Sequence, residues 1–384
     1  MKRLAVALLI ACATLVVAGL WRDPDERLFD FKTYYCAANV YEMGQNPYRV
    51  ENLRAFGGNP RLLGFYYPLS ALHLFRPIAR LDYPVAHRLW LALKVAALAA
   101  LFLVWKRWFL PGTGWPVLLA AGLFAFDAAT LWDLGVGNIT VFEQLCLWTG
   151  FAFLLRARTT VFVVCVVLAS AAKLLPAAFL LLLFTPALRS RANTLRFAAG
   201  VLAVALMTFL PFAADRVYLS DFLRGLVGQH PPLEFNPSLL GVVDELRLHR
   251  GTAFLGTGWP RWVLVAVYYA ALIAVSRRLL RWAADPASPA RTILAGAWLY
   301  ALVAPRLIIY SYMVAIVPLL GLLLPALRQS KAGEWAVVAA VSVTGLQTLP
   351  WKFVSDATPL ILLWGAWLAL VVMEKTGRLT EASS

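Results

Sequence analysis

Charged residues are scarce in this chain. They make up 14% of its 384 residues, against roughly 25% in soluble proteins. Hydrophobic residues reach 61%, and the mean hydropathy is +0.72. Apolar stretches recur along the whole sequence, so no part of it has the composition of a separate soluble domain. The composition predicts an all-α polytopic membrane protein, with one integral domain over residues 1–384.

Cysteine is also scarce, and the four that occur are scattered. They form no Cys-x-x-Cys spacing, so the sequence predicts neither a disulfide framework nor a cysteine metal site. Histidine and glutamate do not cluster, and no phosphate-binding glycine loop occurs. We therefore expect no metal and no cofactor, and a nucleotide site has no support.

Positive charge predominates, with a net charge of +15. Lysine and arginine fall mostly in short clusters at the ends of apolar runs, as in proteins whose cytoplasmic loops carry the positive charge. On the topology that this pattern predicts, most acidic residues fall on the external side. We expect membrane lipids, and no nucleic acid, as partners.

The apolar runs predict about twelve transmembrane helices with both termini in the cytoplasm. We interpret the first run as an uncleaved span, although a signal sequence that ends near Cys12 is the alternative. The expected spans are 4–20, 86–105, 115–135, 140–155, 160–172, 175–188, 197–213, 260–279, 291–304, 308–327, 335–350 and 358–374.

Two long segments, about 21–84 and 214–258, are predicted to lie outside. Within the first, residues 31–43 and 68–80 predict short helices at the membrane interface. Ordered loops rich in carboxylates, aromatic rings and amides often carry binding and catalysis. We therefore expect the active site on this face.

Asp30 is the most promising carboxylate of the external face. In a partly dehydrated setting its pKa would rise, and it could accept a proton from a reacting hydroxyl group. Alternatively, Asp30 could cap the helix that begins near Phe31, and Lys32 could be its ion partner. Asp127 and Asp133 are alternatives for the base, and Asp133 is the stronger of the two because it adjoins the Gly137-Asn138 turn.

Two cations are placed to bind an anionic group. Lys173 lies between two spans that are too short to cross a bilayer unaided, and Arg306 follows Pro305 in a later external turn. A cation in such a place stabilises negative charge on a bound group. The alternatives are a snorkelling side chain for Lys173 and a lipid headgroup partner for Arg306.

The external motifs resemble a known family. They are Asp30-x-x-x-Tyr34-Tyr35-x-Ala37-Ala38, Gly44-x-Asn46-Pro47-Tyr48 and Tyr66-Tyr67-Pro68-Leu69, followed by Arg76-Pro77-Ile78-Ala79. They resemble the first external loop of the multi-spanning C-superfamily (GT-C) glycosyltransferases. Within it the chain is most similar to family eighty-seven, which includes the mycobacterial phosphatidylinositol-mannoside mannosyltransferases. The later pieces Gly137-Asn138, Lys173-x-x-Pro176 and Asn236-x-Ser238-Leu239 fall in the same order.

The resemblance implies a reaction, a location and partners. The reaction is transfer of a sugar, by default mannose, from a polyprenyl-phosphate donor to a glycolipid or glycan acceptor, with inversion at the anomeric carbon. It would occur at the extracytoplasmic face of a bacterial cytoplasmic membrane, with Asp30 as the catalytic base. Relatives often carry histidine and tryptophan in the late hairpin, where this chain has Arg306, Tyr310 and Tyr312.

Several further side chains would suit the recognition of a sugar, because aromatic rings stack on pyranose faces and amides bond hydroxyl groups. Many of these residue types also form ordinary turns. The candidates for substrate binding are Lys32, Tyr34, Asn46, Tyr48, Tyr67, Asp133, Asn138, His230 and Tyr310.

A secondary transporter or lipid flippase is the alternative function. Twelve spans, short broken helices and an intramembrane lysine would suit it. Against it, the two halves of the chain show no repeat, and a long aromatic loop directly after the first span is unusual for a carrier.

Overall fold

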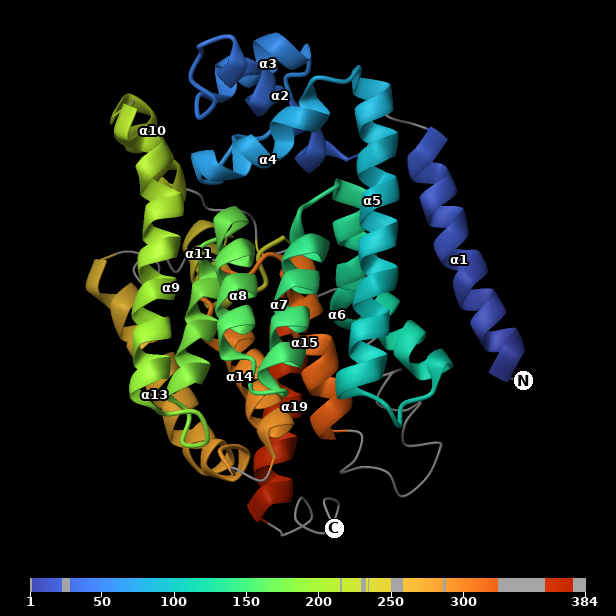
Figure 1. Cartoon of the computed structure of the whole chain (residues 1–384), viewed down its shortest axis with the longest axis vertical. Coiled ribbons are helices and arrows are strands. Elements are labelled where there is room, and N and C mark those ends of the chain that lie inside the picture. Colours follow the sequence, from blue (N-terminus) through green and yellow to red (C-terminus); the bar gives the residue numbers. More distant parts are fainter. Residues whose placement is uncertain are drawn as a thin grey trace. The chain divides into compact units, whose positions relative to one another are not determined.

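The computed structural model describes residues 2–22, 28–214, 216–228, 233, 235–249, 258–285, 288–323 and 356–375. Over these residues every regular element is a helix, which confirms the predicted all-α class for the described part of the chain (Figure 1). The chain divides into two compact units. Unit 1 comprises Met1–Val104, Leu131–Leu183 and Ser190–Gln229, and unit 2 comprises Trp105–Thr130, Phe184–Arg189 and His230–Ser384.

Unit 1 is built on four helices, α5, α7, α8 and α9. Helix α7 packs against α5 and α8, and α8 packs against α9. The short helices α2, α3 and α4 gather at one end of this group (Figure 1). Its helices are α1 (Lys2–Arg22), α2 (Phe29–Glu42), α3 (Val50–Gly57), α4 (Leu69–Ala79), α5 (Tyr83–Val104), the end of α6 (Trp115–Val136), α7 (Thr140–Leu154), α8 (Thr159–Ala172), the 3-10 helices η2 (Leu175–Phe184) and η3 (Leu210–Ala214), α9 (Arg191–Phe209) and α10 (Arg216–Gly228).

Helix α2 confirms the predicted helix over 31–43. Phe31, Tyr34 and Ala38 recur at helical spacing on its buried face, and this face packs against α4. The second predicted short helix is α4, which continues through Pro77. Helix α3 was not expected.

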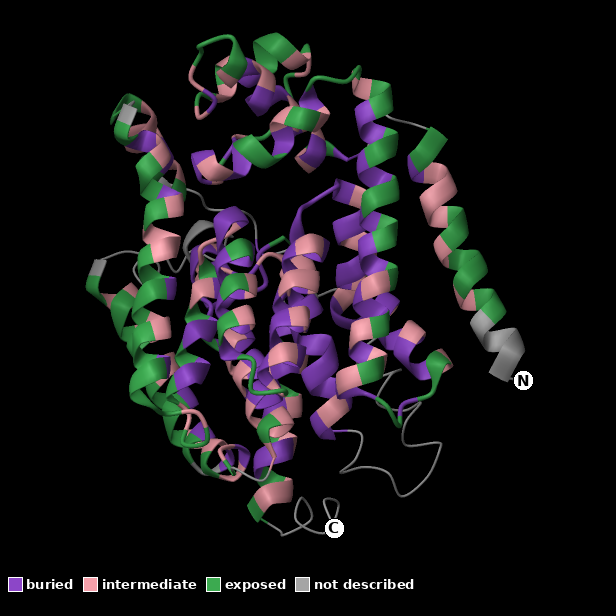
Figure 2. Cartoon of the chain, viewed as in Figure 1, coloured by how far each residue is buried: buried purple, intermediate pink, exposed green. Residues whose placement is uncertain are grey.

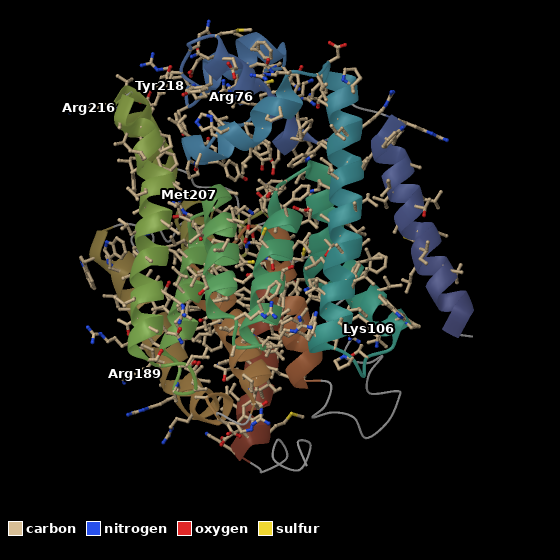
Figure 3. The ribbon with its side chains drawn as sticks, viewed as in Figure 1. Arg76, Lys106, Arg189, Met207, Arg216 and Tyr218 are labelled. Atoms are coloured by element: carbon tan, nitrogen blue, oxygen red, sulfur yellow. The ribbon has the colours of Figure 1, made fainter. Side chains whose placement is uncertain are left out.

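Helix α10 is connected to the loop that follows α2. The hydroxyl group of Tyr218 donates to the carbonyl of Gly44 (3.4 Å), and Asp221 accepts a hydrogen bond from the Asn46 amide (2.7 Å). Arg76 of α4 and Tyr218 both lie at this end of unit 1 (Figure 3). These contacts join the segment around α2–α4 to a later part of the chain.

Unit 2 contains the helices within Trp105–Thr130 and the described helices after His230. Helix α14 packs against α13 and α15, and α19 packs against α13 and α14. Its elements are the π-helix η1 (Trp105–Phe109), the first part of α6, α11 (Leu239–His249), α13 (Gly258–Ala283), α14 (Pro289–Val303), the 3-10 helix η4 (Ile309–Tyr312), α15 (Met313–Pro318), the π-helix η5 (Leu319–Leu323) and α19 (Thr358–Lys375).

Among the described residues, five helical segments are long and apolar enough to cross a membrane: Tyr83–Phe109, Trp115–Val136, Arg191–Ala213, Trp259–Arg277 and Thr358–Lys375. Other expected spans form shorter apolar helices, including Thr140–Leu154 and Thr159–Ala172. The span expected at 335–350 lies outside the described residues. The structure thus has the character of a membrane protein, and the expected number of twelve spans stays a prediction.

Several of the expected spans are not continuous α-helices. The run at 175–188 forms the 3-10 helix η2, and the run at 308–327 changes from 3-10 to α and then to π geometry around Pro318. Proline removes a backbone donor and crowds the preceding turn, which explains a change of geometry there.

Burial differs strongly among the helices of unit 1. Figure 2 shows α7 mainly buried and α9 mainly exposed. The exposed side chains of α9 include Leu202, Leu206 and Phe209. Exposed apolar side chains along a long helix are expected where the helix faces lipid instead of water.

Candidate active site

The Asn138 amide joins the predicted carboxylate to two predicted tyrosines. Its Nδ2 lies 2.7 Å from Oδ2 of Asp30, 2.9 Å from the Tyr34 hydroxyl and 3.0 Å from the Tyr67 hydroxyl. The two tyrosine hydroxyl groups share a hydrogen bond of 2.8 Å. Four residues that the sequence singled out therefore meet in one network within unit 1.

The turn between α6 and α7 places Asn138. Gly137 has φ +74°, and a Cβ there would lie 2.9 Å from Cβ of Phe31 and 3.0 Å from Cβ of Leu28. Only glycine adopts this conformation without strain, and only glycine lets the start of α2 approach so closely. Trp90 of α5 donates to the Gly137 carbonyl (2.8 Å) and holds the turn from a second side.

Asp30 lies in the first turn of α2 and does not cap it. The residue at the N-cap position is Leu28, with φ 55°, and no side chain caps the helix there. The capping interpretation of Asp30 is therefore wrong. Asp30 is partly buried, and among the described residues no hydrogen bond reaches its Oδ1, so this oxygen can accept a proton from a bound molecule.

The pKa of Asp30 is raised from 3.8 to about 6, chiefly because burial disfavours the charged carboxylate. The hydrogen bond from Asn138 and the positive charges of Lys173 and Lys94 oppose this rise, and the negative charge of Asp133 adds to it. A carboxyl group with this pKa is mostly ionised at neutral pH and is a stronger base than an ordinary aspartate.

A fully buried ion pair lies behind the turn. Nζ of Lys94, on α5, is 2.6 Å from Oδ2 of Asp133, on α6, and neither side chain is exposed. The same ammonium group donates a hydrogen bond to the main-chain carbonyl of Asn138. Asp133, which the sequence offered as an alternative base, is thus the partner of a lysine.

Lys173 meets the network from the end of α8. Its ammonium group donates to Oγ1 of Thr140 and lies 3.3 Å from a carboxylate oxygen of Glu143. Thr140 in turn donates through Oγ1 to the Asn138 side-chain carbonyl (2.8 Å), and its backbone N–H donates to the same oxygen (3.1 Å). Lys173 is partly exposed, with 19% of its side-chain surface accessible, so it can also contact a ligand.

Aromatic packing fixes the two tyrosines. The ring of Tyr34 stacks on Phe75, with centroids 4.5 Å apart, and meets the ring of Tyr67 edge to face at 5.1 Å. The main-chain carbonyl of Tyr67 accepts a hydrogen bond from the Tyr48 hydroxyl (2.9 Å). Burial raises the pKa of Tyr67, which keeps its hydroxyl group protonated.

Three other predicted residues of unit 1 have structural contacts. Asn46 bonds Asp221, and its side-chain oxygen accepts from the Tyr48 backbone N–H (2.9 Å), as in an Asx turn. The Tyr48 hydroxyl supports Tyr67. Lys32 lies over the ring of Tyr83, 5.2 Å from its centroid. None of these contacts reaches the Asp30–Asn138 hydrogen bond directly.

The remaining predicted residues belong to the other part of the chain. Arg306 and Tyr310 lie in unit 2, and His230 lies outside the described residues. In unit 2 the Asn236 side-chain oxygen accepts from the Leu307 backbone N–H (3.1 Å), and Ser238 donates to the Pro305 carbonyl (2.8 Å). The predicted Asn236-Pro237-Ser238 motif thus holds the backbone on both sides of Arg306.

Four residues of the site were not predicted: Trp90, Lys94, Thr140 and Glu143. Lys94 and Glu143 carried a usable signal, because a charged residue inside an apolar run is costly and usually has a partner. Trp90 and Thr140 are ordinary in their helices, and only the fold reveals their contacts. The described residues contain no group of three or more His, Cys, Asp or Glu that could hold a metal ion, and the expected absence of a metal stays a prediction.

Comparison with known proteins identifies the family of this chain. The model of glycosyltransferase family 87 matches residues 65–305, which is more than half of the chain. Tyr67, Asn138 and Lys173 lie within the match, whereas Asp30 and Tyr34 precede it. No curated protein and no solved structure matches the chain. The extent of the family match shows that this chain belongs to glycosyltransferase family 87.

Proposed function

We propose that this glycosyltransferase moves a sugar, by default mannose, from a polyprenyl-phosphate donor to a glycolipid or glycan acceptor. The observation that carries the proposal is the Asp30 carboxylate, which Asn138 holds by one oxygen and whose other oxygen has no hydrogen bond among the described residues. The family supplies the reaction class, and the resemblance of the external motifs supports the lipid-linked donor. The family match favours this function over the transporter.

Asp30 acts as the general base in this proposal. The acceptor hydroxyl oxygen attacks the anomeric carbon as its proton passes to Oδ1 of Asp30. The bond between the anomeric carbon and the phosphate oxygen breaks with both electrons going to the phosphate, so the configuration inverts. Asn138 keeps the carboxylate oriented during this step, because its amide donates to Oδ2 (2.7 Å).

Lys173 assists departure of the phosphate. Its partly exposed ammonium group belongs to the Thr140–Asn138 chain of hydrogen bonds that ends at Asp30. A cation in this position stabilises the negative charge that develops on the leaving oxygen, and it does so more strongly where water is excluded. In this chain Asp30 accepts from the Asn138 amide nitrogen, and Lys173 is linked through Thr140 to the oxygen of the same amide.

The reaction is proposed to occur at the extracytoplasmic face of a bacterial cytoplasmic membrane. Helix α5 begins beside α4 and is followed at its other end by Lys106 and Arg107. Positive residues at the end of a span favour the cytoplasmic side, which assigns the α2–α4 end of α5 to the exterior. Both termini are proposed to lie in the cytoplasm.

Replacement of Asp30 by asparagine tests this proposal. We expect Asp30→Asn to lower sugar transfer by about 10²–10⁴-fold, because an amide cannot accept the proton. The assay uses purified protein in detergent, radiolabelled polyprenyl-phosphate mannose and a mixed glycolipid acceptor pool. Glu51→Gln, which neutralises an exposed carboxylate of α3 in the same segment, is the matched control and should transfer at the wild-type rate.

Two outcomes would contradict this proposal. Wild-type transfer by a folded Asp30→Asn protein would move the base to another residue, with Asp133 the next to be tested. Failure of the wild-type protein to use any polyprenyl-phosphate hexose or pentose would overturn the proposed donor class.

A further inference from the structure

We propose that Lys94 is a positioning residue for catalysis, which acts on Asp30 through the main chain of Asn138. This inference rests on the proposed role of Asp30. Nζ of Lys94 bonds both the Asp133 carboxylate (2.6 Å) and the Asn138 carbonyl. The amide of that same asparagine holds Asp30. A single residue therefore separates the buried ammonium group from the catalytic carboxylate.

Both residues of the ion pair hold the turn in place. The main-chain carbonyl of Asp133 accepts hydrogen bonds from the N–H groups of Gly137 (3.1 Å) and Asn138 (3.2 Å), and the Asp133 side chain anchors Lys94. Lys94 then donates a hydrogen bond to the main-chain carbonyl of Asn138. The Asn138 side chain points toward α2, where it bonds Asp30. With these bonds in place, neither the peptide nor the amide of Asn138 can rotate freely.

Stability alone is a poor reason for this pair. Both side chains are fully buried, and removing two charges from water costs free energy that their attraction often fails to recover. An apolar pair of similar volume is frequently as stable or more stable. The position of the pair beside Asn138 gives it another purpose, which is to hold a polar turn in one conformation inside an apolar helix group.

The pair also sets the electrostatic environment of Asp30. The charged groups that influence Asp30 are Lys94 on α5, Asp133 on α6 and Lys173 after α8, and the tyrosines of the network bond its partner Asn138. Glu143 on α7 pairs with Lys173. Lys94 favours the carboxylate form of Asp30, and Asp133 disfavours it. Loss of the Lys94 charge should therefore move the acid limb of the activity profile to higher pH.

The test compares three variants in the assay with polyprenyl-phosphate mannose, with kcat, the KM for the donor and the pH profile as readouts. We expect Lys94→Met/Asp133→Leu to fold and to lose roughly tenfold to a hundredfold in kcat, since a small misplacement of a catalytic group has this effect, while the donor KM stays unchanged. Its acid limb should move to higher pH, as should that of Lys94→Met. Asp133→Asn should also lower kcat, because it removes the carboxylate that anchors Lys94. Thr208→Val, which removes a buried hydroxyl group on α9, is the control and should change none of these readouts.

A folded double variant with wild-type kcat and an unchanged acid limb would show that the pair is only structural, and would overturn the inference. Asp30→Asn is measured alongside. If that variant transfers sugar at the wild-type rate, the proposed role of Asp30 fails, whereas an inactive Asp30→Asn with a normal double variant rejects only the role of Lys94.

Discussion

Asp30 combines two features that a base at neutral pH needs. Burial raises its pKa to about 6, so that the carboxylate is a better proton acceptor and yet remains mostly ionised. The Asn138 amide keeps one oxygen engaged, which leaves the other for the substrate. A free carboxylate on an exposed loop would have neither the raised pKa nor the fixed orientation.

The pH dependence of transfer follows from this pKa. Because the base must be deprotonated, kcat/KM should be maximal above the pKa of Asp30 and fall tenfold per pH unit below about 6. Initial rates measured from pH about 4 to about 8, at donor concentrations below KM, report this limb. An acid limb near the ordinary aspartate value of 3.8 would mean that Asp30 is not buried in the working enzyme.

The residues of the site differ in how far the sequence could predict them. Asp30, Tyr34, Tyr67 and Asn138 stood in recognisable motifs, and the structure brings them together. Their mutual contacts were not predictable, since they join residues 33 to 108 positions apart. Lys94 was overlooked because its partner Asp133 was interpreted alone, as an acidic residue at the outer end of a span.

At the scale of helices and turns, the 133–140 turn is the element on which the site depends. It carries Asn138, receives bonds from Trp90 and Lys94, and contacts the start of α2 through Gly137. No single side chain in it does chemistry in the proposed mechanism. Its conformation nevertheless decides where the Asn138 amide lies.

A methyl group at Gly137 should disrupt this turn. Gly137→Ala forces an alanine to φ +74° and places its Cβ 2.9 Å from Cβ of Phe31. We expect a loss of roughly 1–3 kcal/mol in unfolding free energy and a clear fall in transfer, because α2 and Asp30 must move away. Thermal unfolding in detergent and the transfer assay measure the two effects.

Gly135 offers the matched control for that substitution. No atom lies within 4 Å of a Cβ built there, and its φ is not positive. Gly135→Ala should therefore be neutral or slightly stabilising. Equal losses in the two alanine variants would contradict the role given to the Gly137 conformation.

The helices themselves were more predictable than their irregularities. Apolar runs and flanking charges placed α5, α7 and α8 to within three residues, whereas α9 begins six residues before its predicted span. They did not predict the break in α6, where Ala125–Ala128 leave helical geometry. Such features depend on tertiary packing, which is not encoded in local periodicity.

At the scale of the whole molecule, unit 1 is assembled from three separate stretches of chain. All of the hydrogen bonds to Asn138 described above lie within it. It cannot be isolated by a single cut, so experiments on the site need the full chain. The topology of that chain in the membrane is the property on which the proposed extracytoplasmic chemistry depends.

Single cysteines test this topology. In a background without Cys12, Cys36, Cys146 and Cys165, Arg61→Cys should react in intact cells with a membrane-impermeant maleimide, because its loop lies between α3 and α4 on the proposed external side. Gly112→Cys, beyond the far end of α5, should react only after permeabilisation. The reverse pattern would place the site in the cytoplasm and exclude an extracytoplasmic donor.

The hydrogen bond between Asp30 and Asn138 spans 108 residues of sequence, and this separation matters during biosynthesis. The carboxylate leaves the ribosome well before its asparagine, and chains fold from the N-terminus as they are made. Until α5, α6 and α7 have been inserted, Asp30 has neither its Asn138 partner nor the nearby Lys94 charge. A nascent or truncated chain that ends before Asn138 lacks the partner that orients Asp30, and we expect it to be inactive. The ability to transfer sugar therefore arises late in synthesis, after most of unit 1 has been inserted in the membrane.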